Sequence, residues 1–92
     1  MAEEDEMSAW VYLLRCGADD SLYTGWTSDL ERRMRAHRAG KASRYTRSRL
    51  PVELAAAVAM PDATAARREE ARIKRLTRTQ KLALIAALDD RY

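Results

Sequence analysis

The stretch from residue 22 to residue 37 contains four residues whose side chains or backbone suit chemistry: Tyr23, Gly25, Arg33 and His37. An arginine guanidinium binds the negative charge that grows on a phosphate during displacement. A histidine moves protons near neutral pH, and a tyrosine acts as a base or relay where cations stabilise its phenolate. A glycine inside a strand permits close approach by another group. These residue types together indicate proton transfer beside a bound anion.

A second tyrosine, Tyr12, lies in an alternating run from residue 10 to residue 16 that predicts a strand. The short turn-forming segment 17–20 then predicts an antiparallel hairpin. A register that pairs Tyr12 with Gly25 and Leu14 with Tyr23 places both tyrosines on one face. The alternative, for each tyrosine taken singly, is that its ring only packs the hairpin.

A helix is expected to follow the hairpin, from about Asp29 to Arg38. Ser28 fits the first position of a capping box that Glu31 completes, and Gly40 suits the end of the helix. Arg33 and His37 share one stripe of this helix with Leu30 and Met34. Arg33 is then either a phosphate ligand or one more solvated arginine, and His37 is either a proton relay or a structural histidine.

Three further elements complete the expected fold. Residues 52–60 have a helix-forming composition but lie between two prolines, and we interpret them as a third strand. Asp62 caps a second helix that runs to about Arg75, and Thr77 begins a third. In this third helix the core-facing residues are expected to be Leu82, Ile85 and Leu88. The predicted fold is α+β, with a small three-stranded antiparallel sheet flanked by three helices in the order β-β-α-β-α-α.

Two adjacent acids, Glu69 and Glu70, interrupt the otherwise cationic second helix. A half-buried carboxylate here would suit a hard divalent cation. The alternative is ordinary salt bridging, for instance between Glu70 and Lys74 one turn later. Two nearly equivalent helical stripes leave open which glutamate faces inward.

Length and composition limit the class of protein. Ninety-two residues suffice for a single hydrophobic core. One cysteine, Cys16, excludes an internal disulfide and a cysteine zinc site. No apolar run reaches the ~20 residues of a membrane-spanning helix, so we expect no membrane partner. Residues 1–8 read as a disordered acidic leader, residues 9–90 as a single domain, and the protein as cytoplasmic.

The formal net charge of +3 hides a segregation of charge along the chain. Segment 31–49 contains eight basic residues and one acid, and segment 67–81 contains seven basic residues and two acids. Two separated basic segments, in a chain whose acids lie mainly near its ends, indicate a surface that binds a polyanion, with nucleic acid the leading candidate. The alternative is a solvated helix surface without a ligand.

At these residues the chain resembles the GIY-YIG nuclease superfamily, in particular its small stand-alone bacterial branch, which is related to the UvrC N-terminal catalytic domain. Segment 10–12 is similar to the first signature and segment 23–25 to the second, at an appropriate spacing. The similarity continues through segment 29–33, His37 and segments 40–41, 45–47 and 51–52, and it ends with Glu70 and segment 73–76. Departures from the signatures occur at Trp10, Val11 and Thr24, and the chain contains no asparagine, which some catalytic relatives use late in the domain.

The resemblance implies a role for each matched residue. Tyr12 and Tyr23 would orient or deprotonate the attacking water, Arg33 would bind the scissile phosphate, and His37 would assist proton transfer. Glu70 would hold one ion, Mg²⁺ or Mn²⁺. Gly25 would have a structural role. Contacts with nucleic acid are assigned to residues of the two basic segments, namely Lys41, Arg44, Tyr45, Thr46, Arg47 and Lys74.

The sequence therefore predicts a metal-dependent nuclease that hydrolyses phosphodiester bonds of structured DNA, with RNA as the other nucleic-acid partner. Two alternatives stay open. One is a module that binds nucleic acid without cleaving it, and the other is a basic adaptor for a partner protein. Little room for base-specific contacts exists in a domain of this size, so phosphate contacts and steep salt dependence are expected.

Overall fold

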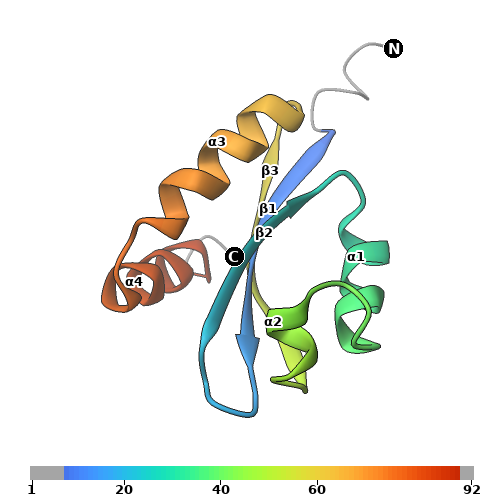
Figure 1. The fold of residues 1–92 in the computed structure, drawn as a ribbon. Coiled ribbons are helices and arrows are strands. Elements are labelled where there is room, and N and C mark those ends of the chain that lie inside the picture. The colour runs from blue at the N-terminus through green and yellow to red at the C-terminus, as the bar shows by residue number, and fades with distance from the viewer. Residues whose placement is uncertain (1–7, 90–92) are drawn as a thin grey trace.

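The computed structural model describes residues 8–89, which form one α+β fold (Figure 1). The predicted acidic leader, residues 1–8, lies outside the described residues except for Ser8. The order β-β-α-β-α-α is confirmed, with one short additional helix, α2, that the sequence did not predict. The elements are β1 (Ala9–Cys16), β2 (Leu22–Thr27), α1 (Leu30–Arg38), α2 (Arg44–Arg47), β3 (Val52–Met60), α3 (Ala63–Lys74) and α4 (Arg78–Asp89).

Strand β1 is the centre of the antiparallel sheet, which has the order β2-β1-β3 within residues 8–89. The predicted hairpin register is confirmed, because Tyr12 pairs with Gly25 and Leu14 with Tyr23. Both tyrosines consequently project from the same face of the sheet. Strand β3 pairs with the other edge of β1, and its register shifts at Leu13/Leu14. This shift leaves one extra residue, Ala55, in β3, as in a β-bulge.

Helices cover both faces of the sheet, as Figure 1 shows, with α1 and α2 on one side and α3 and α4 on the other. The alternation of β1 divides the core accordingly. Val11 and Leu13 belong to the cluster on the α3 side, which also contains Ala66 and Ile73. Tyr12 and Leu14 belong to the cluster on the α1 side. Both sets are buried, so β1 holds the two layers together.

The start of α1 differs from the predicted capping box. Asp29, not Ser28, is the N-cap, and its carboxylate accepts a 3.1 Å hydrogen bond from the Arg32 amide. Ser28 and Asp29 are both good capping residues, so the local pattern did not distinguish them. The helix ends as expected at Gly40, whose φ is 75°. The Gly40 amide donates to His37 and the Lys41 amide to Ala36, which are the two bonds of a Schellman motif.

The last helix, α4, has the predicted start but a different inward face. The Thr77 amide donates to the Gln80 side chain and the Gln80 amide to the Thr77 hydroxyl, so the capping box is confirmed. Leu84, Ile85 and Leu88 pack against the α3-side cluster. The prediction is confirmed for Ile85 and Leu88, whereas Leu82 is not among the residues packed against this cluster and, with Ile85, lines a surface pocket beside β3. Leu84, which the predicted stripe did not include, packs inward instead.

No helix among residues 8–89 is long and apolar enough to cross a membrane. Cys16 is buried at the end of β1, and it is a free thiol.

Candidate active site

Tyr12 is the buried centre of the site. Its side chain extends across the sheet over its partner Gly25, where a Cβ atom would lie 2.6 Å from the Tyr12 hydroxyl. Only glycine leaves this space, which gives the predicted structural role of Gly25 a physical basis. Burial raises the pKa of the Tyr12 hydroxyl, while the Arg33 guanidinium acts to lower it. Tyr12 is therefore protonated at neutral pH, and it can act as a base only by passing its own proton on.

His37 can receive that proton. Its Nε2 lies 2.8 Å from the Tyr12 hydroxyl oxygen, and its Nδ1 lies 2.9 Å from the Thr46 hydroxyl oxygen. The imidazole, which belongs to α1, is fully buried. Burial, together with the nearby Arg33 guanidinium, lowers the pKa of His37 to about 4. The ring is thus neutral near pH 7, with one nitrogen that carries a proton and one that accepts one.

Arg33 supplies positive charge on the same side of the sheet. Its charge acts on the pKa values of both Tyr12 and His37. Within residues 8–89 its buried Nε has no hydrogen-bond partner, which is costly unless a ligand satisfies it. Arg33 also lines a surface pocket of about 370 Å³ between the end of β2 and the first turns of α1, together with Arg32. Its donors can therefore bind an anion from solvent.

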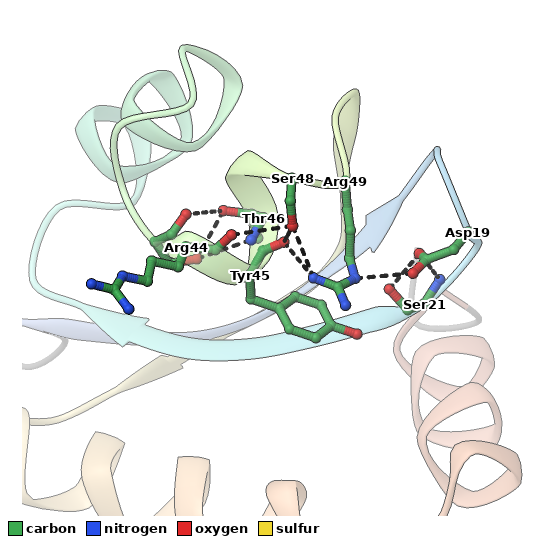
Figure 2. Close-up of polar contacts among 8 residues, drawn as sticks. Asp19, Ser21, Arg44, Tyr45, Thr46, Ser48 and Arg49 are labelled. Atoms are coloured by element: carbon green, nitrogen blue, oxygen red, sulfur yellow. Dashed lines mark hydrogen bonds and ion pairs between the residues drawn. The ribbon is translucent and has the colours of Figure 1, made fainter.

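Tyr23 joins the site through aromatic contacts. Its ring meets the His37 ring edge-on with centroids 5.4 Å apart, and it stacks on Tyr45 with centroids 5.8 Å apart. The Arg49 guanidinium lies 3.7 Å from the centre of the Tyr45 ring. Figure 2 shows that Arg49 is fixed in turn by Asp19, through a 2.9 Å bond from Arg49 Nε. The hairpin turn thus holds the aromatic stack in place.

Glu70 belongs to α3, which lies on the other side of the sheet from α1 (Figure 1). Its side chain is 20% exposed, and its nearest cation is Lys74 at 3.3 Å. The Glu70 charge nevertheless acts to raise the pKa of Tyr12, as does Tyr23. Glu69 is 26% exposed and makes two hydrogen bonds, of 2.9 and 2.7 Å, to Arg72. Of the two glutamates, Glu70 is the one whose charge is felt at the tyrosine.

Glu70 is the one carboxylate of the candidate site within the described residues that could bind a divalent cation. Among residues 8–89 no three acidic, histidine or cysteine side chains gather at one point. A single half-buried carboxylate fits Mg²⁺, which keeps several of its waters and takes its remaining ligands from phosphate oxygens. Glu70 is the residue that would hold such an ion, after release of Lys74.

Of the residues predicted to bind nucleic acid in segment 41–47, most face solvent and one is buried. Lys41, Arg44 and Arg47 line one surface pocket of about 220 Å³ at the loop before and within α2. In Figure 2 Arg44 points away from the polar contacts of the loop. Tyr45 is 37% exposed, but Thr46 is completely buried. Thr46 therefore belongs with His37 rather than with the solvent-facing residues, and its predicted contact with nucleic acid does not fit its position.

Several residues of the site were not found from the sequence. Ser43 caps α2 and bonds the Thr46 hydroxyl, and Asp19 and Arg49 brace the aromatic stack. Ser43 precedes a four-residue helix, and its small polar side chain three residues before Thr46 is a capping signal. Asp19 and Arg49 are thirty positions apart in the sequence, and no local pattern connects them.

The fold and this cluster of tyrosines, histidine and arginine agree with a known family. Residues 8–83 match the model of the GIY-YIG catalytic domain, and the chain belongs to that family. GIY-YIG domains are nuclease domains that act on nucleic acid and generally use a divalent metal.

The relatives described next are small proteins similar in length to this chain. The chain is 49% identical over 80 residues to a UPF0213 protein of Streptococcus sanguinis, which covers 87% of this chain and 91% of that one. It is 47% identical over 78 residues to a UPF0213 protein of Clostridium perfringens, with coverage of 85% and 83%. The solution NMR structure of a UPF0213 protein from Bacillus halodurans is 42% identical, with a TM-score of 0.56 over 86% of this chain and 83% of that one. The similarity to a small stand-alone GIY-YIG protein is thus confirmed.

Proposed function

We propose that this protein is a metal-dependent phosphodiesterase that cleaves DNA at structured or single-stranded sites. The observation that carries the proposal is the buried 2.8 Å hydrogen bond between Tyr12 and His37, beside the guanidinium of Arg33. Membership of a nuclease family gives the reaction class. The bond between Tyr12 and His37 supports a route for the proton of the attacking water.

The proton route follows from the pKa values. Because Tyr12 is protonated at neutral pH, a water beside it is activated only if the Tyr12 proton moves away as the water proton arrives. The neutral His37 ring accepts that proton on Nε2. Tyr23, held by its contacts with His37 and Tyr45, orients the water from the other side. The resulting hydroxide forms the new P–O bond as the ester P–O bond breaks.

Arg33, whose Nε has no hydrogen-bond partner among residues 8–89, binds the scissile phosphate. The negative charge of the phosphate grows during the displacement, so the interaction strengthens in the transition state. Mg²⁺ or Mn²⁺, when held by Glu70, supplies positive charge to the leaving oxygen. Lys41, Arg44 and Arg47 contact phosphates outside the site and position the strand.

The direct test is cleavage of a panel of labelled DNA and RNA structures with Mg²⁺ or Mn²⁺. Glu70→Gln is expected to reduce the rate by roughly 100-fold or more, because metal charge contributes several kcal/mol to the transition state. Glu69→Gln is the matched control, since Glu69 is a similarly exposed carboxylate on the same helix but is paired with Arg72. Arg33→Ala should lose a comparable factor. Cleavage by the Glu70→Gln protein at the wild-type rate would refute the assignment.

One observation favours a second function. The Lys74 ammonium lies 3.3 Å from the Glu70 carboxylate, and this ion pair would have to break before Glu70 could hold a divalent ion. A chain in which this pair persists would bind nucleic acid without cleaving it. Binding of the same panel without cutting by the wild type, at any concentration of Mg²⁺ or Mn²⁺, would support this function. In either case the affinity should fall steeply with salt, and triple replacement of Lys41, Arg44 and Arg47 by alanine should flatten the log–log slope by about 3.

A further inference from the structure

The bond between Tyr12 and His37 is the first link of a buried chain of hydrogen bonds that continues into α2. His37 Nδ1 lies 2.9 Å from Thr46 Oγ1, and Thr46 Oγ1 lies 2.9 Å from Ser43 Oγ. Tyr12, His37 and Thr46 have no exposed surface. Bulk water is therefore excluded from the three partners in the free protein, where each polar atom depends on its protein neighbour, and a water that reaches the Tyr12 hydroxyl enters with the substrate.

The direction of the first bond follows from the contacts of the second ring nitrogen of His37. The Arg33 guanidinium acts to lower the pKa of the Tyr12 hydroxyl, so it favours negative charge on the phenolic oxygen. At the other end of the imidazole, Nδ1 faces the Thr46 hydroxyl, whose own proton has an acceptor in the Ser43 carbonyl. Nδ1 is then the donor to Thr46. Since a neutral imidazole carries one proton, Nε2 is left to accept from the Tyr12 hydroxyl.

Thr46 is arranged to accept the Nδ1 proton. Its own hydroxyl proton has two acceptors in Ser43, the side-chain oxygen at 2.9 Å and the main-chain carbonyl at 3.5 Å. A lone pair is left for His37. Ser43 also fixes the position of Thr46, because the Thr46 amide donates a 3.1 Å bond to Ser43 Oγ at the N-cap of α2. The short helix thus presents one hydroxyl to the histidine in one orientation.

We propose that Thr46 is a positioning residue that holds His37 as the Nδ1–H tautomer, so that Nε2 remains free to accept the proton of Tyr12. The catalytic consequence rests on the proposed function, whereas the tautomer does not. In the hydrolytic step the water proton moves to the Tyr12 oxygen as the Tyr12 proton moves to His37 Nε2. Thr46 loses no proton, and it stabilises the positive charge that His37 acquires. The opposite tautomer would donate to Tyr12 and block this transfer.

His37 is the only histidine of the chain, which makes the tautomer directly measurable. Two-bond ¹H–¹⁵N correlation spectra of the ¹⁵N-labelled protein at pH 7 contain one imidazole, and its two nitrogen shifts identify the protonated atom. In the wild type we expect a protonated Nδ1 and an unprotonated Nε2. Thr46→Val keeps the shape of the side chain without the hydroxyl, and it should shift the nitrogen signals toward the Nε2–H form. Thr46→Ser keeps the hydroxyl and should retain the wild-type pattern.

Activity provides the second measurement. Thr46→Val should lower kcat on the order of 100-fold, the lower range of general acid–base contributions, with little change in KM. Thr46→Ser should recover most of the rate. An Nε2–H tautomer in the wild type, or unchanged nitrogen shifts in folded Thr46→Val protein, would overturn the proposal. The wild-type spectrum alone decides the matter if Thr46→Val does not fold.

The two proposals fail separately. Absence of cleavage by all proteins, together with an Nδ1–H tautomer that depends on the Thr46 hydroxyl, would refute the nuclease and leave the positioning role intact. Cleavage that is insensitive to Thr46→Val would leave the nuclease intact and refute the role of Thr46.

Discussion

Acidification from pH 7 to pH 5 should destabilise this protein through one residue, His37. Its imidazole is fully buried, and its pKa in the folded protein is about 4 against an ordinary value of 6.5. The unfolded chain therefore binds a proton below pH 6.5 that the folded chain does not bind until about pH 4. Stability from the neutral imidazole is complete above pH 6.5 and is lost as the pH falls through this window.

The magnitude follows from the width of the window. Each pH unit between the two pKa values costs about 1.4 kcal/mol, so a fall from pH 6.5 to pH 5 removes about 2 kcal/mol. For a domain of this size that loss lowers Tm by roughly 8–16 °C. The carboxyl groups contribute at lower pH, because the pKa values of Asp19 and Glu69 are lowered from ordinary values near 4. The loss of stability between pH 6.5 and pH 5 is consequently due to His37.

Thermal denaturation followed by circular dichroism at constant ionic strength measures this effect at pH 7, 6 and 5. The control is His37→Gln, which cannot titrate and should show a nearly constant Tm over this range, although at a lower value. A wild-type Tm that stays constant from pH 7 to pH 5, or an equal decline in the His37→Gln protein, would refute the reasoning. An NMR titration of the imidazole with a midpoint near 6.5 would refute it independently.

Three other substitutions give defined outcomes. Gly25→Ala places a Cβ 2.6 Å from the Tyr12 hydroxyl. It should lower the free energy of unfolding, measured by chemical denaturation, by about 1–3 kcal/mol. Displacement of the Tyr12 ring should also reduce any cleavage rate by about 100-fold. Asp29→Ala removes the N-cap of α1 and should lower the free energy of unfolding by about 1 kcal/mol in the same measurement. The control Ser28→Ala should lower it much less. Equal losses of stability in the two variants would contradict the assignment of Asp29 as the cap. Tyr45→Ala removes the outer ring of the aromatic stack, which contacts Tyr23, and should weaken binding of single-stranded DNA in fluorescence anisotropy by about 1 kcal/mol or more. An unchanged affinity would contradict this expectation.

The hairpin could be predicted from the sequence because its information is local. Alternation in β1 fixes which side chains share a face, and a short turn fixes the register. Pairing of Tyr12 with Gly25 then follows without any knowledge of the rest of the fold. Caps were less certain because Ser28 and Asp29 are chemically similar acceptors in neighbouring positions, and only the path of the chain decides between them.

The remaining errors arise where burial is decided by distant residues. Thr46 lies in a basic loop that looks solvent-exposed in the sequence, yet packing against His37 buries it completely. The inward face of α4 depends on how that helix rests on the α3-side cluster, so Leu84 rather than Leu82 packs inward. The choice between Glu69 and Glu70 also needs the neighbouring layer, because both lie on acceptable stripes of α3.

The β-bulge at Ala55 has a consequence for how the molecules meet one another. Strand β3 is an edge of the sheet, and its sequence from Leu54 to Met60 contains only apolar residues. A long, regular edge of this kind invites the same strand of another molecule to continue the sheet. The extra residue interrupts the spacing of backbone donors and acceptors, and the charged side chain of Glu53 is exposed beside it. The irregularity therefore disfavours continuation of the sheet by the same strand of another molecule.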